Sequence, residues 1–303
     1  MQRLIVVYNP RSSRYADVKQ EVLARVKELN GYLVGKYEVA ATNLDDNIAQ
    51  LSKIIKDGDL VLSAGGDATG IISSNAILKS DKDATLAVLP YGNFNDLSRT
   101  LHTKKFEDVF NRQDDASRNF YPLEIYIDGK FFRYATCYVT IGMTAEAVQI
   151  YDSPELRAKL KSKFGRKITS YTELIKWYFQ NRRNHTFIPP FKLNGIPQDN
   201  RISDYAAVNG RSMARVMRGG EDYRDSSYFR HETERLTSFP RLMNLMLHSI
   251  FSRVPGSATS GDILEFENPS SVMLQAEGES IKLKDAHRIE IKKGTKCLKV
   301  IEN

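Results

Sequence analysis

The sequence predicts two domains: an α/β domain whose parallel sheet has helices on both faces, followed by an antiparallel β-sandwich domain. Three observations carry this prediction. The chain has 303 residues, which is long for one ordinary core and short for three, at roughly 100–200 residues per domain. Stretches typical of strands and of helices alternate over residues 1–120. After Tyr121, hairpin signals replace this alternation.

Composition excludes several classes of protein. The 41% hydrophobic, 10% aromatic and 27% charged residues are typical of a globular chain and argue against a disordered, collagenous or disulfide-dense one. No apolar run approaches the ~20 residues of a membrane span, and the stretch from Leu4 to Val7 is too short for a signal peptide. We therefore expect a cytoplasmic protein. Cys137, Cys297 and the five scattered histidines have no zinc-type spacing, so we expect no metal bound through sulfur or imidazole.

The first half of the chain reads as alternating strands and helices. Leu4 to Tyr8 is a bare apolar run, typical of a strand buried on both faces, and Ala16 to Leu29 has helical apolar spacing. Further strands are predicted at Tyr37 to Ala41, Leu60 to Ser63 and Leu86 to Leu89, and further helices at Ile48 to Ile55 and Ile71 to Leu78. Such alternation indicates a parallel sheet, in which ligands bind beyond the carboxyl ends of the strands.

The second half reads as antiparallel. Asp128-Gly129 and Asn194-Gly195 are two-residue turn signals of the type I′ class. Strands are predicted at Leu123 to Ile127, Phe131 to Val139, Phe187 to Leu193, Ser203 to Val208, Ile263 to Phe266, Val272 to Gln275, Ile281 to Leu283 and Ile289 to Ile291. Helical patterns occupy Glu155 to Gln180 and Phe239 to Phe251. This pattern indicates a sandwich or open barrel.

Three polar loops follow strands of the predicted parallel sheet. Residues 63–70, Ser-Ala-Gly-Gly-Asp-Ala-Thr-Gly, open a helix, and glycines there would let the backbone cradle phosphate. The alternative is a tight turn in which Asp67 caps its own helix. Residues 89–96 follow the next strand, where Asn95 or Asp96 could cap a helix, and residues 8–13 follow the first strand. We expect the three loops to converge at one edge.

These motifs resemble the diacylglycerol kinase catalytic-domain superfamily, which includes soluble bacterial lipid kinases and sphingosine and ceramide kinases, with NAD kinases more distant. Asn9-Pro10-x-Ser12 is similar to N-P-x-S-G, and residues 65–69 are similar to G-G-D-G-T. Residues 90–96 are similar to P-x-G-T-x-N-D, and residues 277–279 are similar to D-G-E. The resemblance implies an α/β ATP-binding domain over residues 1–121, completed by the tail at 286–303, and a β-sandwich lipid-substrate domain over residues 122–285 with helical insertions.

The resemblance also implies an ATP-dependent lipid kinase that uses Mg²⁺ and phosphorylates the hydroxyl of a diacylglycerol-like or sphingoid lipid. Residues implied at the nucleotide are Asn9, Ser12, Thr42, Gly65, Gly66, Asp67, Ala68, Thr69, Gly92, Asn93 and Asn95. Glu279 is the implied catalytic base and Glu277 would assist it. Asp222, Asp225 and Ser227 form an acidic turn suited to a hard cation.

Some positions depart from the family pattern. Ala68, Ile72, Asn93 and Glu277 replace residues that are usual in the superfamily. Alanine at position 68 would cost on the order of 1 kcal/mol if that position needed a positive φ. Two hypotheses fit these changes: an active kinase, or a catalytically degenerate nucleotide- or lipid-binding protein of the same fold.

Charge is concentrated in one segment. The net charge is +7, and residues 153–183 hold nine basic residues against Glu155 and Glu173, together with Phe164, Tyr171, Trp177, Tyr178 and Phe179. A solvated helix pair explains this pattern, and so does a footprint on an anionic membrane surface. With a lipid substrate we expect the second, hence a peripheral protein at the inner membrane surface. We expect no nucleic-acid partner, because no reader motif is present, and a homodimer is left open.

Overall fold

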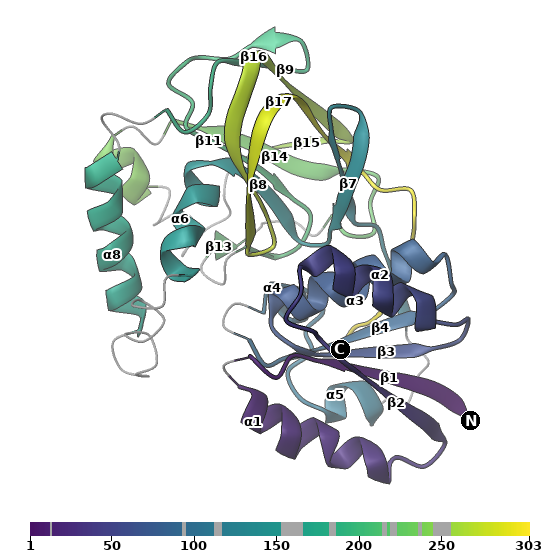
Figure 1. Cartoon of the computed structure of the whole chain (residues 1–303). Coiled ribbons are helices and arrows are strands. Elements are labelled where there is room, and N and C mark those ends of the chain that lie inside the picture. The colour runs from purple at the N-terminus through teal and green to yellow at the C-terminus, as the bar shows by residue number, and fades with distance from the viewer. Residues whose placement is uncertain are drawn as a thin grey trace.

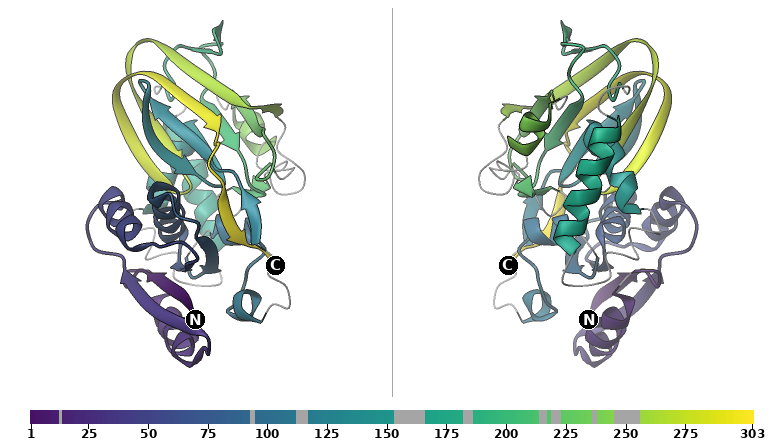
Figure 2. Two further views of the ribbon diagram at one scale, coloured as in Figure 1. Left: turned by 90° about the vertical axis from the view of Figure 1, so that its right-hand side faces the viewer. Right: turned by 90° about the vertical axis from the view of Figure 1, so that its left-hand side faces the viewer.

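The protein is described by a computed structural model that covers residues 1–12, 14–92, 95–111, 117–152, 166–181, 186–213, 217–218, 223–235, 238–244 and 256–303. Two sheets dominate it: a six-stranded, largely parallel sheet and a ten-stranded antiparallel sheet. Figure 1 shows the helix-covered parallel sheet below the antiparallel one, and the two views of Figure 2 keep this stacking. The predicted fold class, an α/β domain followed by an antiparallel all-β domain, is confirmed.

The first sheet has the strand order β2-β1-β3-β4-β18-β5. Its strands are β1 (Gln2–Tyr8), β2 (Tyr32–Glu38), β3 (Leu60–Gly65), β4 (Thr85–Pro90), β5 (Ser117–Phe120) and β18 (Leu298–Ile301). The first four are parallel, β18 lies parallel to β4, and β5 runs antiparallel to β18. The chain thus returns to its first sheet near residue 300.

Helices cover both faces of this sheet because successive side chains of a strand point to opposite faces. Ile5 and Val7 pack in a core with α2 (Leu44–Ile54) and α3 (Asp67–Ser80). Leu4 and Val6 pack in another core with the helical segment 15–28. That segment consists of α1 (Tyr15–Asp17), a π-helical stretch (Val18–Leu23) and a 3₁₀ stretch (Arg25–Glu28). The bare apolar pattern of β1 is therefore explained by burial on both sides.

The strand predicted at Tyr37 to Ala41 was placed too late in the sequence. The observed strand, β2, spans Tyr32–Glu38 and pairs with β1 alone. An edge strand is half exposed, so its exposure alternates along the chain and it lacks the continuous apolar run that marked its neighbours. Gly35 in its centre weakened the signal further.

The second sheet has the order β15-β14-β11-β8-β16-β17-β6-β7, and off this path β9 pairs with β16 and β10 pairs with β9. Its strands are β6 (Leu123–Ile127), β7 (Lys130–Ala135), β8 (Tyr138–Gly142), β9 (Phe191–Leu193), β10 (Ile196–Pro197), β11 (Asp204–Val208), β14 (Phe229–Glu234), β15 (Ser257–Thr259), β16 (Gly261–Ala276) and β17 (Glu279–Lys293). One core cluster unites most of these strands, so the sheet folds over itself. A two-stranded ribbon, β12 (Ser212–Met213) with β13 (Met217–Arg218), lies apart.

The predicted hairpin turns are confirmed. Asp128 and Gly129 have φ values of 49° and 76°, and Asn194 and Gly195 have values of 53° and 80°, as type I′ turns require at both central residues. In two places the sequence suggested pairs of short strands, and the structure joins each pair into one long strand, β16 or β17. Register shifts between Glu265 and Val272 interrupt their ladder and divided the apolar pattern in the sequence. Bulges of this kind help a sheet to curl.

Helices α6 (Met143–Asp152) and α8 (Arg166–Asn181) lie beside the second sheet (Figure 2). The helix predicted from Glu155 to Gln180 is matched by α8 in its later part, and residues 153–165 and 182–185 lie outside the described residues. Residues 239–244 are helical, and 245–251 are outside the description. Tyr178 is buried in a cluster with Met143 and Phe187, so this ring is a core residue and not the interfacial aromatic that was expected.

Two further helices, α4 (Asp96–Thr100) and α5 (Glu107–Phe110), complete the first domain. Leu97 and Leu101, in and just after α4, belong to a core that continues into the second domain through Tyr134, Tyr138 and Val208. The two domains thus share one apolar cluster. Within the described ranges, no helix combines the length and the hydropathy needed to cross a membrane.

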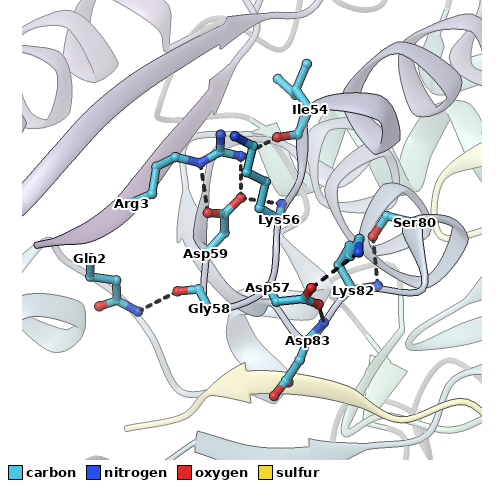
Figure 3. A network of polar contacts seen from close by, with 10 residues as sticks. All are labelled: Gln2, Arg3, Ile54, Lys56, Asp57, Gly58, Asp59, Ser80, Lys82 and Asp83. Atoms are coloured by element: carbon cyan, nitrogen blue, oxygen red, sulfur yellow. Dashed lines mark hydrogen bonds and ion pairs between the residues drawn. The ribbon is translucent and has the colours of Figure 1, made fainter.

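A polar network fixes the edge of the first sheet at which β3 begins (Figure 3). Asp59 is 2% exposed and accepts hydrogen bonds from Arg3 Nε at 2.8 Å, from Arg3 Nη2 at 2.6 Å and from the Lys56 amide at 2.7 Å. The Arg3 guanidinium also donates to the carbonyl of Ile54, the last residue of α2. The network ties β1, β3 and α2 together at the edge opposite the polar loops.

Candidate active site

The loops after β1, β3 and β4 converge at one edge of the first sheet, as the sequence predicted. Ser12 Oγ donates to the Tyr91 carbonyl at 2.8 Å, and Arg14 Nη1 donates to the Pro90 carbonyl at 3.0 Å. The Arg14 guanidinium also lies 5.2 Å from the centre of the Tyr91 ring. The first loop is therefore fastened to the loop that follows β4.

Glycines bring the second and third loops into backbone contact. A Cβ atom on Gly92 would lie 2.2 Å from Gly66 Cα, and one on Gly65 would lie 2.3 Å from Thr69 Oγ1. A larger residue at position 92 would push the two loops apart, and one at position 65 would displace the Thr69 side chain of the same loop. Gly65, Gly66 and Gly92 do not have positive φ angles, so close approach, and not an unusual backbone angle, requires glycine here.

Ala68 fits its position without strain. It lies in the first turn of α3 and is absent from the positive-φ residues of the described chain. The conformational cost considered for alanine at this position therefore does not arise. Thr69 follows it and is 1% exposed, and its carbonyl accepts from Ser73 Oγ at 2.9 Å.

Asp67 connects two helices. Its carboxylate accepts the backbone amides of Asn95 at 3.0 Å and Asp96 at 2.8 Å, so it satisfies the first amides of α4 from the neighbouring loop. In the simpler interpretation Asp67 would cap its own helix, but the residue at the cap position of α3 is Gly66. Asn95 has a left-handed backbone, with φ 58°, and makes no side-chain cap.

Asn95 instead closes the turn before α4. Its Oδ1 accepts from the Gly92 amide at 2.8 Å, and its Nδ2 donates to the Gly92 carbonyl at 2.8 Å. This pair of bonds holds Gly92 against Gly66. Asn93, predicted at the nucleotide, lies outside the described residues.

The hairpin turn between β16 and β17 reaches this edge from the second domain (Figure 1). Glu277 and Gly278 have φ values of 51° and 92°, and a Cβ on Gly278 would lie 3.9 Å from Asp67 Cβ. Glu277 is 4% exposed, and its Oε1 accepts from Thr136 Oγ1 and from the Cys137 amide. Glu279, the first residue of β17, is half-buried. The two acidic residues of the turn thus have different surroundings.

Three carboxyl groups gather where the turn meets the loops: Asp67, Asp96 and Glu277. Burial, together with the charge of Asp96, raises the pKa of Asp67 to about 7. Burial also raises the pKa of Glu277 to about 7, against the hydrogen bonds from Thr136 and Cys137, and the charges of Asp67 and Asp96 raise it further. Carboxyl groups that repel one another in this way favour a bound cation. Oxygen donors suit Mg²⁺, which usually keeps several waters and binds through one or two carboxylates plus phosphates.

The described residues contain no preformed metal cage, since no three His, Cys, Asp or Glu side chains among them converge closely enough. Of the acidic turn predicted as a metal site, Asp222 lies outside the description, and Asp225 and Ser227 are exposed. Asp225 lines a cavity of about 510 Å³ beside Arg224 and Glu302. Arg224 Nη1 donates to the carbonyl of Thr100, the last residue of α4, whereas Asp67 meets the first. A metal role for this turn stays a prediction.

Asn9 and Thr42 shape the rims of the site. Asn9 Oδ1 accepts from the Arg11 amide at 2.9 Å, which turns the first loop. Thr42 Oγ1 accepts from Asn47 Nδ2 at 3.2 Å. Asn47 is 1% exposed and also binds the Ala40 amide at 2.8 Å, so it holds the loop that carries Thr42.

Several residues of the site were not predicted from the sequence. Thr136 and Cys137 hold Glu277, and Tyr138 is 1% exposed beside the carboxyl groups. Burial, followed by the charges of Asp96, Asp67 and Glu277, raises the pKa of Tyr138 well above its ordinary value. Gln275 Nε2 donates to the Tyr138 hydroxyl at 3.3 Å. In the sequence, only the polar stretch Thr136-Cys137-Tyr138 inside the predicted strand Phe131 to Val139 could have indicated these residues.

Comparison with known proteins agrees with the resemblance that the motifs indicated. Residues 3–118 match the family model "Diacylglycerol kinase catalytic domain". A diacylglycerol kinase of Bacillus subtilis (strain 168) is 28% identical over 171 residues, which make up 54% of this chain and 52% of that protein. The match therefore spans about half the length of the relative. The superfamily resemblance indicated by the motifs is confirmed.

Solved structures share the fold. A crystal structure of a diacylglycerol kinase from Bacillus anthracis str. Sterne superimposes with a TM-score of 0.67 at 16% identity, covering 100% of this chain and 97% of that one. Two further structures from the same strain give TM-scores of 0.65 and 0.68 with the same identity and coverage. At this identity the likeness establishes the architecture of both domains.

Proposed function

We propose that this chain, whose residues 3–118 match the family model of the diacylglycerol kinase catalytic domain, transfers the γ-phosphate of ATP to the hydroxyl of a diacylglycerol-like or sphingoid lipid. The observation that carries this proposal is the approach of the Glu277-Gly278 turn to Asp67. It places acidic residues of one domain over the glycine-rich loops of the other. Phosphoryl transfer needs positioning, charge neutralisation and a base near the attacking hydroxyl, and the residues of this site are candidates for these three roles.

The nucleotide would lie over the converged loops. Gly65, Gly66 and Gly92 leave the backbone bare of side chains, and α3 presents the amides of its first turn beside them. A helix of 14 residues presents a positive dipole end and unpaired amides to phosphate. Asn9, Ser12, Thr42 and Thr69 border this edge on the first domain's side, which supports the predicted ATP contacts.

Magnesium would be held by one or two of the carboxyl groups of Asp67, Asp96 and Glu277, together with water and the nucleotide phosphates. Their burial and mutual repulsion make the cluster unfavourable when it is fully ionised without a cation. A bound divalent ion supplies neutralisation of the phosphates. The residues present therefore fit the metal that the family implies.

Glu279 is the proposed base and Glu277 supports it. Glu277 is buried and its carboxylate accepts hydrogen bonds from Thr136 and Cys137. Glu279, at the start of β17, is only half-buried and is the more accessible of the two. In the reaction Glu279 takes the proton from the lipid hydroxyl. The lipid oxygen then bonds to the γ-phosphorus as the bond to the ADP oxygen breaks.

A membrane-bound substrate implies a peripheral location at an anionic lipid surface. Phe179, on α8, is 44% exposed, and interfacial aromatics beside basic residues are typical of such surfaces. Binding to vesicles that contain anionic lipid is expected to fall as salt rises, because exposed charges are screened over about 10 Å at 0.1 M. Equal binding at low and high salt would contradict an electrostatic footprint.

The experiment that tests the kinase proposal incubates the protein with radiolabelled ATP, Mg²⁺ and a panel of lipids in mixed micelles. Glu279→Gln is expected to leave ATP affinity nearly unchanged and to lower transfer by at least ~100-fold. Glu267→Gln, at an exposed position of β16, is the matched control. A parent protein that binds ATP but labels no lipid would favour the degenerate binder instead.

A further inference from the structure

A second group of chemically reactive side chains lies on the antiparallel sheet. His231 of β14 and Ser257 of β15 are directly opposed across the two strands. His231 Nε2 lies 2.7 Å from Ser257 Oγ, and His231 Nδ1 lies 2.5 Å from Asp262 Oδ2, on β16. A hydroxyl, an imidazole and a carboxylate are thus joined in sequence by two hydrogen bonds, the arrangement that marks an activated nucleophile.

The hydrogen bonds determine which tautomer the neutral His231 imidazole adopts. An ionised carboxylate only accepts hydrogen bonds, so the Nδ1 atom beside Asp262 carries the proton in the neutral ring. The Nε2 atom then holds a lone pair that accepts the hydrogen of Ser257. This is the tautomer that a general base needs in order to take the proton of a serine hydroxyl.

Asp262 is held in place more firmly than a surface carboxylate. Its side chain is 0% exposed, and it also accepts from the Tyr205 hydroxyl at 2.7 Å and from Asn194 Nδ2 at 2.9 Å. Burial alone would raise the pKa of Asp262, but the hydrogen bonds from His231, Asn194 and Tyr205 outweigh it and leave the pKa below its ordinary value. The carboxylate therefore stays ionised and can stabilise a protonated imidazole.

Accessibility increases along the three residues. Asp262 is fully buried, the His231 side chain is 21% exposed, and Ser257 is exposed. The group that would attack faces solvent while the group that orients the base is enclosed. A mere tie between strands would need neither a buried carboxylate behind the imidazole nor two further donors fixing that carboxylate.

We propose that Ser257 is a nucleophile activated by His231, with Asp262 as the positioning residue, and that it reacts with the carbonyl of carboxylic esters. Ser257 Oγ bonds to the ester carbon as its proton passes to His231 Nε2. The ester C–O bond breaks, and the alcohol leaves with the proton from His231. Water, deprotonated by His231, then attacks the acyl-serine to release the carboxylic acid and restore the hydroxyl. This activity is separate from the proposed phosphoryl transfer, and its site uses none of the loops after β1, β3 and β4.

The test treats the full chain with a fluorophosphonate probe, which transfers its phosphonyl group to an activated serine with loss of fluoride, and locates the adduct by peptide mass spectrometry. Labelling is expected at Ser257. Ser257→Ala is expected to abolish it, and His231→Asn to slow it by at least ~100-fold. Ser260→Ala, at a neighbouring exposed serine, is the matched control and is expected to label like the parent. 4-Nitrophenyl acetate, a simple carboxylic ester, should show the same ranking in release of 4-nitrophenolate.

The role of Asp262 is tested by a pH profile, which a structural role would not move. Within the part of the chain that the structure describes, the ionisable groups that face His231 are Asp262 of β16 and Tyr205 of β11. Side chains that alternate to the other face include Asp204, Arg230, Glu232 and Glu234, which interact with one another. Asp262→Asn removes the adjacent negative charge, so the pH at which labelling of Ser257 is half-maximal is expected to move downward while the maximal rate falls.

Two results would overturn the proposal. The first is labelling of Ser257 in the parent no faster than labelling of Ser260. The second is labelling of Ser257 that is unchanged in His231→Asn, in a variant whose thermal unfolding matches the parent. Either result would leave the three residues as a cross-strand tie. A separate loss of ATP-dependent lipid labelling would bear on the proposed kinase activity and not on this site.

Discussion

The carboxylate of Asp67 binds the backbone amide of Asp96 at 2.8 Å while the carboxyl groups of the same two residues repel each other. The backbone amides at the start of α4 therefore attract the Asp67 carboxylate, while the carboxylate of Asp96, the first residue of α4, repels it. The approach of Glu277 from the second domain adds a third acidic group. The geometry of the loops and the affinity for a cation thus both depend on the carboxyl groups of Asp67, Asp96 and Glu277.

Replacing Asp67 should weaken nucleotide binding. Asp67→Ala removes the acceptor of two amides and one charge of the cluster, so the affinity for ATP with Mg²⁺ is expected to fall tenfold or more, as a loss of about 1.4 kcal/mol gives. Isothermal titration calorimetry measures this directly. Asp83→Ala, in an exposed ion pair with Lys299 away from the polar loops, should bind ATP like the parent. Full affinity in Asp67→Ala would remove Asp67 from the nucleotide site.

Stability should fall as pH rises toward 7 in the absence of divalent cations. Asp67 and Glu277 have pKa values of about 7 in the folded protein and ordinary values near 4 when unfolded. Between these values the folded state binds more protons, so the cluster stabilises the protein below about pH 4 and this contribution is lost as pH rises to about 7. The size is on the order of a kcal/mol per unit of pKa difference.

Urea unfolding at several pH values measures this dependence. Asp204 and Glu232 also have raised pKa values, so the informative quantity is the difference between the parent and Asp67→Asn with Glu277→Gln. The double variant should show the smaller decline between pH 4 and 7, and Mg²⁺ should stabilise the parent more at pH 8 than at pH 5. Parallel pH profiles for the two proteins would contradict the assignment.

Gly92→Ala should separate the two glycine loops. The added Cβ would meet Gly66 Cα at 2.2 Å, and overpacking of this kind costs about 1–3 kcal/mol. Both the free energy of unfolding and the affinity for ATP are expected to decrease. Gly35→Ala is the control, because its Cβ would meet no atom closer than 3.8 Å, and a neutral or slightly stabilising effect is expected there. Equal unfolding midpoints for the two variants would mean that the two loops separate at little cost in free energy, and would contradict this prediction.

Asp59→Ala should lower stability without touching the nucleotide site. The change leaves the Lys56 amide and the Arg3 guanidinium without their partner (Figure 3). Removing one partner of a buried, hydrogen-bonded pair costs about 3–5 kcal/mol, less where the other partner is partly exposed, as Arg3 is. Asp83→Ala, in an exposed pair with Lys299, should change stability by about 0–1 kcal/mol. Chemical denaturation compares the variants, and unchanged ATP affinity in both is expected.

Local rules explain what could be predicted from the sequence. The buried strand β1 follows from its apolar run, and the Asp128-Gly129 turn follows from a dipeptide that accepts two positive φ angles. The gathering of the loops follows from the common direction of parallel strands. Each of these inferences needs only residues close in sequence, or one general rule of topology.

Contacts between distant segments explain what could not be predicted. One of the two interpretations of the sequence had Asp67 capping its own helix, but its actual partners lie in another loop, at Asn95 and Asp96. The donors that hold Glu277 come from Thr136 and Cys137, more than a hundred positions earlier. Nothing in a single sequence marks which buried amide a given carboxylate will reach. The position of β2 was missed for a different reason, because an edge strand carries a weak apolar pattern.

The insertion of β18 between β4 and β5 has a consequence for how the protein is made. On the ribosome, β1 to β4 emerge early, yet the partner of β4 on that side is residues 298–301. Until those residues emerge, β4 presents an unpaired edge, and such an edge readily pairs with another chain. The first domain therefore completes its sheet after synthesis of the second, so a nascent chain stalled near residue 121 should depend on chaperones more than the finished protein.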